Sequence, residues 1–340
     1  VLAAGTAALN LGRNATLAAG LPLSVPGQTI DRQCSSGLMA IATAAKQIVV
    51  DGMQVVVAGR QDNITAVQSA YFKDAMVNKD TALESRVPNA YMPMLLTAEN
   101  LARKFGISRE AQDAHSLLSQ QRTAAAQKAG TFKDEIAPMT TVMGVVDKAT
   151  GRITRKEVTI AADEGIRADT TLEGVSGLRS ALPGGIVTAG NASQFSDGAS
   201  ACVVMNGKLA EQRGIQPLGI FRGFAIAGCE PDEMGIGPVY AVPRLLQRAG
   251  LKVSDIGLWE LNEAFAAQGL AVTRMLGVAD NDPRVNPNGG AIALGHPLGA
   301  TGAIRSATVV HALQRQNLRY GMVTMCVGMG QGAAGIFERV

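Results

Sequence analysis

The sequence has few residues that bind metal ions or form covalent cross-links. Its 340 residues include four cysteines and three histidines, with no C-x-x-C pair and no zinc-ligand spacing. So few cysteines in so long a chain also argue against a disulfide framework. We therefore expect no metal site and a reducing, cytoplasmic location.

Long apolar runs and a strong charge of one sign are also lacking. No stretch of about 18 apolar residues occurs, so no membrane span is expected. The 31 basic and 28 acidic side chains give a formal net charge of +3, too small to indicate a nucleic-acid partner. No G-x-x-x-x-G-K-[ST] phosphate-binding loop is present.

Glycine, in contrast, is abundant, and the 39 glycines cluster around three potentially reactive side chains. Cys34 lies in Asp31-Arg32-Gln33-Cys34-Ser35-Ser36-Gly37, between a strand-like run over 28–31 and a helix predicted from Ser35. A helix N-terminus favours a thiolate, which suits a nucleophile. The alternative is a buried structural cysteine, the usual fate of a free thiol.

His296 and Cys326 have similar glycine-rich settings. His296 follows Gly289, Gly290 and Gly295 and precedes Pro297, and Cys326 ends an apolar strand before Gly328 and Gly330. Glycines allow close backbone approach and leave N–H groups free to stabilise an oxyanion. A tight turn with no chemical role is the alternative in each case. We interpret the other cysteines and histidines as structural or incidental: Cys202, Cys229, His115 and His311.

The order of predicted elements suggests two related halves. A helix over 38–50 and a strand over 54–59 are repeated by a helix over 302–313 and a strand over 321–328. The segments 197–204 and 331–338 also resemble each other. We predict a first half over residues 1–66 completed by 186–208, an inserted domain over 67–185, and a second half over 209–340. Within the insertion, Ser108 is predicted to cap a helix that reaches about Gln127.

Together with Asn262-Glu263-Ala264-Phe265, these motifs resemble those of the thiolase family and occur in the same order and at approximately the same separations. Further similarity lies in Thr97-Ala98-Glu99-Asn100, Val187–Ser193 and Met234–Pro238, so the resemblance covers essentially the whole chain. It implies an α/β thiolase-like fold, with two βαβ-type halves in an αβαβα arrangement and an inserted loop domain.

The resemblance also implies site roles. Cys34 carries the acyl group as a thioester, His296 accepts its proton, and Asn262 holds a water that completes an oxyanion hole. Cys326 is the second acid/base, and the N–H groups of Cys34 and Gly328 form a second hole. Contacts with the substrate are expected at Met94, Gly223 and Phe265, and five basic residues are candidates for the CoA phosphates: Arg103, Lys104, Arg152, Arg155 and Lys156.

The implied activity is reversible acetyl-CoA C-acetyltransfer, with acyl-CoA and CoA as substrates and no further cofactor. The alternatives are a 3-ketoacyl-CoA thiolase for longer-chain or 3-oxoadipyl substrates, a decarboxylating ketoacyl synthase, and a catalytically silent CoA- or lipid-binding member. The second acid/base at Cys326 disfavours a synthase, which pairs its cysteine with histidine or asparagine. The resemblance implies a homo-oligomer, a dimer or tetramer.

Several positions depart from the family pattern. Gly59-Arg60-Gln61-Asp62-Asn63-Ile64 replaces a Gly-Gly-x-Glu-Ser-Met run, Gly223 replaces a serine, and Pro93 precedes Met94 where many members have histidine. These changes bear on acyl-chain preference. The sequence also begins after the family's first β-α segment, from which we expect residues 1–340 alone to be insoluble or inactive.

Overall fold

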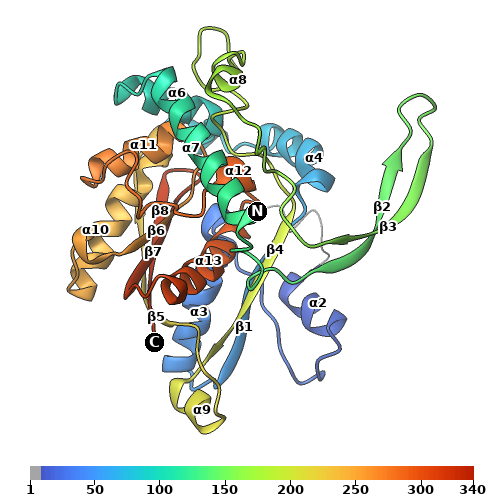
Figure 1. Ribbon diagram of the computed structural model, residues 1–340, viewed down its shortest axis with the longest axis vertical. Helices are drawn as coiled ribbons and strands as arrows, with labels where there is room; N and C mark the ends of the chain where they lie inside the picture. The colour runs from blue at the N-terminus through green and yellow to red at the C-terminus, as the bar shows by residue number, and fades with distance from the viewer. Residues whose placement is uncertain (1–8) are drawn as a thin grey trace.

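The computed structural model describes residues 9–340, apart from the side chains of residues 71, 72 and 74–76. Two sheets are separated by a layer of helices (Figure 1). One sheet pairs β1 (Val55–Asp62) with β4 (Gly198–Met205) in antiparallel register. The other has the order β5-β8-β7-β6, formed by β5 (Ile220–Gly228), β6 (Leu258–Leu261), β7 (Tyr320–Val327) and β8 (Gln331–Glu338).

The helices α3 (Ser36–Val50) and α13 (Thr301–Arg315) form the layer between the sheets. Their apolar faces share one core with both sheets, which includes Leu38 and Ile41 of α3 and Val309 of α13. On the other face of the four-stranded sheet lie α10 (Gly237–Ala249) and α11 (Ala266–Met275), around a second core. Burial of these apolar faces is the main force that holds the layers together.

The predicted internal repeat is visible in the order of elements. Helix α3 leads into β1, which pairs antiparallel with β4. Helix α13 leads into β7, which pairs antiparallel with β8. The layered α/β architecture is therefore as predicted. Four of the five expected layers appear among residues 9–340: α10 with α11, the four-stranded sheet, α3 with α13, and the β1–β4 sheet. On the β1–β4 sheet, the side chains of Val57 and Val203 are 63% and 61% exposed.

The two central helices approach each other closely at their first turns. A Cβ at Gly37 would lie 2.6 Å from the backbone nitrogen of Ala303, and one at Gly302 would lie 2.5 Å from that of Leu38. The backbone N–H of Gly37 donates to the carbonyl of Gly299 at 2.8 Å. Glycine at both positions thus lets the segments that precede the two helices meet.

The inserted region contributes helices near the site and a projecting hairpin. Its helices are α4 (Ile64–Val77), α5 (Thr81–Arg86), α6 (Met94–Lys104), α7 (Arg109–Lys128) and α8 (Leu172–Ser176). As predicted, Ser108 caps α7, accepting from the N–H of Ala111. The hairpin, β2 (Met139–Val146) with β3 (Ile153–Ile160), extends away from the sheets with nearly every residue exposed (Figure 1).

The remaining elements are short. They are α2 (Leu11–Ala18), α9 (Gly207–Gln212), α12 (Ala291–Leu294) and the 3₁₀ turns η1 (Gln33–Ser35), η2 (Pro231–Ile236) and η3 (Val253–Asp255). The strand predicted over 28–31 is wrong: this stretch is irregular and pairs with no strand. The first eight residues of the predicted 1–66 half lie outside the described part.

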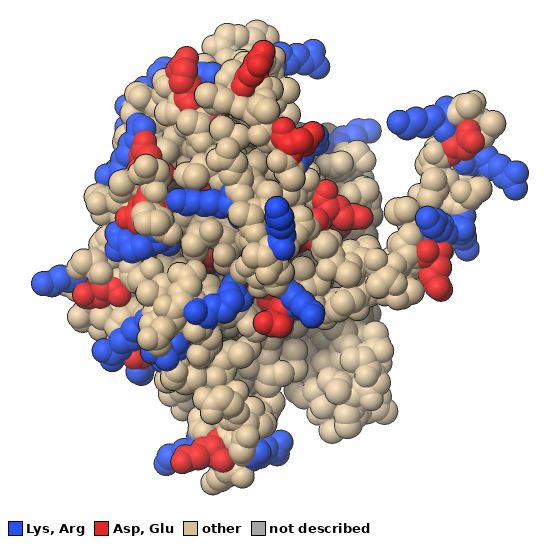
Figure 2. Space-filling view, in the orientation of Figure 1, with Lys and Arg blue, Asp and Glu red and all other residues tan. Residues whose placement is uncertain are grey.

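The surface is mixed in charge, in keeping with the small net charge. Basic and acidic side chains alternate over the face in Figure 2, and the hairpin β2–β3 carries both signs. Among residues 9–340, no helix is both long and apolar enough to cross a bilayer.

Candidate active site

Cys34 lies in η1, directly before α3, and is 3% exposed. Burial raises the pKa of its thiol to about 11, although the backbone N–H groups of Gly328 and of Cys34 itself act in the opposite direction. The expectation of a thiolate at this helix start is therefore wrong for the resting protein. Loss of hydration around the sulfur outweighs the N–H groups, so Cys34 rests as a neutral thiol.

Cys326 lies near the end of β7 and is 1% exposed. Its pKa is raised well above the ordinary value, by burial and by the neighbouring Cys34. Gly328 follows on the next turn, with its N–H directed at the Cys34 sulfur. The structure thus brings Cys34, Cys326 and Gly328 together, in keeping with the arrangement that the family resemblance implies.

His296 and Asn262 form a second pair, both buried. The Thr301 hydroxyl donates to the carbonyl of Pro297 at 3.1 Å, so its oxygen accepts from Nδ1–H of His296 at 2.6 Å. Nε2 is then the unprotonated nitrogen, and Nδ2 of Asn262 lies 3.3 Å from it. Burial, with a contribution from Arg305, lowers the pKa of His296 to about 3. The ring is therefore neutral, and the lone pair on Nε2 accepts from the Asn262 amide.

Short links join the two groups of residues. Leu298, two residues after His296, packs in one apolar cluster with Cys34. The N–H of Asn262 donates to the carbonyl of Thr324 at 3.0 Å, two residues before Cys326. The site is therefore assembled where the N-termini of α3 and α13 meet the ends of β6 and β7.

Arg60 and Asp62 were not predicted as part of this assembly. Their side chains form a buried ion pair at 3.1 Å at the end of β1. The other oxygen of Asp62 accepts from the N–H of Ala300 at 2.9 Å, in the loop after His296. A Cβ at Gly299 would collide with both side chains. The Arg60–Asp62 pair, in the segment 59–64 that differs from the family pattern, thus supports the loop after His296. The only sign of this role in the sequence was an acidic residue near the end of the strand.

The predicted substrate-contact residues lie in different places. Met94, at the start of α6, and Phe265, before α11, pack against the apolar cluster that contains Cys326. Gly223 lies within β5, where a Cβ would meet Leu245 of α10 at 3.2 Å. Met94 and Phe265 are therefore positioned beside Cys326, whereas Gly223 faces α10; their roles stay predictions.

The basic candidates divide in the same way. Lys104 pairs with Glu233 of η2, next to Met234 in the Cys326 cluster. Arg155 and Lys156 lie on the projecting hairpin, with Arg152 just before its second strand. Among the other cysteines and histidines, Cys202 lies in β4, Cys229 follows β5, and His311 lies in α13. His115 is not incidental, since it lies 3.2 Å from the buried carboxylate of Glu263.

The described residues contain no group of three or more His, Cys, Asp or Glu side chains suited to a metal ion. The site instead offers two buried thiols, a neutral imidazole with an unprotonated nitrogen, and backbone N–H groups directed at a sulfur. These are the components of covalent catalysis by cysteine. Fold and site thus define an enzyme of acyl transfer.

Comparison with known proteins gives the family. The family model for the thiolase N-terminal domain matches residues 1–208, and the model for the thiolase C-terminal domain matches residues 215–339. The chain belongs to the thiolase family, whose members are acyltransferases.

Individual relatives span nearly the whole chain. A 3-ketoacyl-CoA thiolase of Bacillus subtilis is 45% identical over 97% of this chain and 83% of its own. An acetyl-CoA acetyltransferase of Chromobacterium violaceum is 44% identical over 100% of this chain and 86% of its own. The crystal structure of the dimeric peroxisomal thiolase of Saccharomyces cerevisiae aligns with a TM-score of 0.86 and 39% identity, covering 98% of this chain and 82% of that one.

Proposed function

We propose that the chain catalyses thiolytic cleavage of a short 3-ketoacyl-CoA and the reverse condensation of two acetyl-CoA, with the acyl group carried on Cys34. The observation that carries this proposal is that two buried thiols, Cys34 and Cys326, lie next to each other, with the backbone N–H of Gly328 directed at Cys34. A reaction that needs only a nucleophile would require one thiol. Chemistry that also moves a proton at carbon needs a second acid/base.

In the first half-reaction, the Cys34 sulfur attacks the ketone carbonyl while its proton passes to Nε2 of His296. Because Cys34 rests as a thiol, this proton acceptor is required, and the thiolate that forms favours the protonated imidazole. The N–H groups of Cys34 and Gly328, which are directed at the Cys34 sulfur, hold the oxyanion in this proposal. The carbon–carbon bond then breaks, Cys326 donates its proton to the leaving enolate of acetyl-CoA, and an acyl thioester remains on Cys34.

The pair His296 and Asn262 supports the enolate oxygen in this scheme. Oδ1 of Asn262 is buried and has no hydrogen-bond partner among the described residues. It can therefore accept from a water that donates to the enolate oxygen. In the second half-reaction, Cys326 takes the proton of the CoA thiol as its sulfur attacks the thioester. Cys34 then leaves and regains its proton from His296.

Acyl-chain length is the finer part of the proposal. Acetoacetyl-CoA is favoured by the likeness to an acetyl-CoA acetyltransferase. Longer substrates are the second candidate, favoured by the likeness to 3-ketoacyl-CoA thiolases. A homo-oligomer is proposed on the likeness to a dimeric thiolase. A reducing, cytoplasmic location is proposed from the four free cysteines.

The test is a thiolysis assay with acetoacetyl-CoA, a medium-chain 3-ketoacyl-CoA and 3-oxoadipyl-CoA, combined with mass spectrometry of the acylated protein. We expect acylation of the Cys34 peptide and the highest kcat/KM with acetoacetyl-CoA. Cys34→Ala should lose cleavage and condensation together, and Cys202→Ser is the matched control. Turnover in Cys34→Ala, or acylation at another residue, contradicts the proposal. Preference for a longer chain contradicts its finer part.

A further inference from the structure

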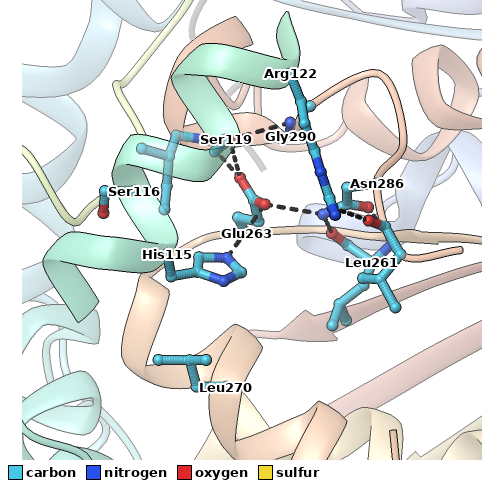
Figure 3. A network of polar contacts seen from close by, with 12 residues as sticks. His115, Ser116, Ser119, Arg122, Leu261, Glu263, Leu270, Asn286 and Gly290 are labelled. Carbon is cyan, nitrogen blue, oxygen red and sulfur yellow. Dashed lines mark hydrogen bonds and ion pairs between the residues drawn. The ribbon is translucent and has the colours of Figure 1, made fainter. Parts of the chain in front are cut away.

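A polar network lies in the interior beside the reacting groups, centred on Glu263 (Figure 3). Glu263 directly follows Asn262 and is 2% exposed. None of the proposed chemical steps uses its carboxylate. A buried carboxylate requires specific partners, because the loss of hydration strongly disfavours its charge.

The carboxylate of Glu263 is contacted on both oxygens. Oε2 accepts from the Ser119 hydroxyl at 2.7 Å and from the N–H of Ile292 at 3.3 Å. Oε1 accepts from Nδ2 of Asn286 at 2.9 Å and lies 3.2 Å from Nε2 of His115. Burial alone would raise its pKa, but the contacts with His115, Ser119 and Asn286 prevail and bring it to about 2. Glu263 is thus charged at every pH of practical interest.

These contacts join three segments that are distant in the sequence. His115 and Ser119 belong to α7, in the inserted region. Asn286 also binds the backbone of Leu261 on both sides, through its Oδ1 at 2.9 Å and its Nδ2 at 2.8 Å. Ile292 lies in α12, four residues before His296. Glu263 therefore connects the segment that carries Asn262 to the segment that carries His296, and both to α7.

The two glycines of the histidine segment have their explanation here. A Cβ at Gly290 would lie 2.1 Å from the Glu263 carboxylate, and one at Gly289 would lie 1.7 Å from the Thr123 hydroxyl of α7. The Ser119 hydroxyl also accepts from the N–H of Gly290 at 3.1 Å. These glycines admit the carboxylate and α7, so the close approach that they allow is to other parts of the protein.

From this arrangement we propose that Glu263 is a positioning residue, whose carboxylate, held by α7, sets the relative placement of Asn262 and His296. The inference rests on the proposed function, in which these two side chains support the enolate oxygen. Nδ2 of Asn262 and Nε2 of His296 are 3.3 Å apart, a separation that a small shift of either segment would lose. Misplacement by about 1 Å can reduce turnover by about 100-fold.

The central test is Glu263→Gln. The amide keeps the shape but places an NH₂ group against a donor, either Nδ2 of Asn286 or the N–H of Ile292. We expect kcat to fall about 10- to 100-fold with KM for the acyl-CoA within about threefold, because the substrate contacts are elsewhere. The control is Glu338→Gln, which should keep wild-type turnover. The Glu338 carboxylate is bound by Arg222 and Arg319 at the end of β8 that lies away from Cys326.

A double-mutant cycle with Asn262→Ala separates positioning from general stability. If Glu263 acts through Asn262, then Glu263→Gln in the Asn262→Ala background should lower kcat less than about twofold. Additive losses, or an unchanged kcat in the single variant, overturn the proposal. Should Glu263→Gln fail to fold, Ser119→Ala is used in the same cycle, since it removes one donor to the carboxylate without changing charge.

The outcomes also distinguish this inference from the proposed function. If the wild-type protein shows neither thiolysis nor acylation of Cys34, the proposed function fails. If the wild type is active and Glu263→Gln matches Glu338→Gln in kcat, only the positioning role fails.

Discussion

At the residue scale, the main result is that Cys34 and His296 both rest in their neutral forms. Burial raises the pKa of the thiol to about 11 and lowers that of the imidazole to about 3. The dry site thus opposes charge on either side chain alone. In the proposed mechanism, proton transfer between them has to accompany attack on the substrate, and this transfer can be tested.

We predict that His296→Asn slows alkylation of Cys34 by iodoacetamide at pH 7, about 10-fold or more, because the thiol loses its proton acceptor. As pH rises toward 11, the thiolate forms unaided and the two rates should converge. The measurement is mass spectrometry of the Cys34 peptide from pH 6 to 10. Cys202 is an internal control, since burial also raises its pKa to about 11. Equal rates at pH 7 in the variant and the wild type would argue against His296 as the acceptor.

The second thiol has a separate prediction. Cys326→Ser should slow condensation about 100-fold or more, since proton transfer at carbon needs an acid/base that a hydroxyl replaces poorly. Acetyl transfer from acetyl-CoA to Cys34 should persist, because it moves no proton at carbon. Mass-spectrometric acetylation and a condensation assay on one preparation test both parts, with Cys202→Ser as the control. Wild-type condensation in Cys326→Ser would refute the assignment.

At the element scale, the crossing of α3 and α13 determines whether the site can form. Both helices begin at the site, and at Gly37 and Gly302 a side chain would press on the backbone of the other helix. A backbone atom cannot turn away as a side chain does, so the helices themselves would have to separate. Packing at one contact is therefore coupled to the distance between the Cys34 and His296 loops.

We predict that Gly37→Ala lowers the free energy of unfolding by about 1–3 kcal/mol, the usual effect of overpacking. Urea denaturation monitored by circular dichroism measures it. Gly207→Ala at the start of α9 is the matched control, because a Cβ there would meet nothing within 4 Å. Activity of Gly37→Ala should fall as well. A variant as stable as the control would show that the two helices separate at little cost.

At the scale of the whole molecule, the buried neutral His296 makes stability depend on pH. Its pKa is about 3 in the folded chain against 6.5 for the free side chain, so the unfolded chain binds more protons between these values. The free energy of unfolding should therefore rise with pH across this window, and fall as the solution is acidified from about 6.5. One such group gives a slope of about 1.4 kcal/mol per pH unit.

We predict that His296→Asn removes about this much slope between pH 4 and 6, whatever its effect on absolute stability. Urea denaturation at several pH values gives the slopes. His311→Asn serves for comparison and should change the slope less, because water still reaches its half-buried ring on α13. An unchanged slope in His296→Asn would mean that the imidazole becomes protonated without unfolding.

The sequence, through its resemblance to the thiolase family, implied the layered arrangement. Without that resemblance it determined the α/β class, the internal repeat and the positions of the main reactive residues. These depend on local patterns: apolar periodicity for the central helices and strands, a serine cap for α7, and glycines around Cys34, His296 and Cys326. Local patterns survive folding when burial and hydrogen bonding reinforce them, as happened for α3, β1, α13 and β7.

Only the tertiary structure decided the protonation states and the supports of the site. The helix start at Cys34 suggested a thiolate, but desolvation, which depends on everything packed around the sulfur, reversed the sign. His115 seemed incidental in its own helix, yet folding places it against Glu263, 148 positions away. Asp62, paired with Arg60, reaches the histidine loop at Ala300 across a longer gap of 238 positions. Such effects arise from contacts between distant segments, which no local pattern encodes.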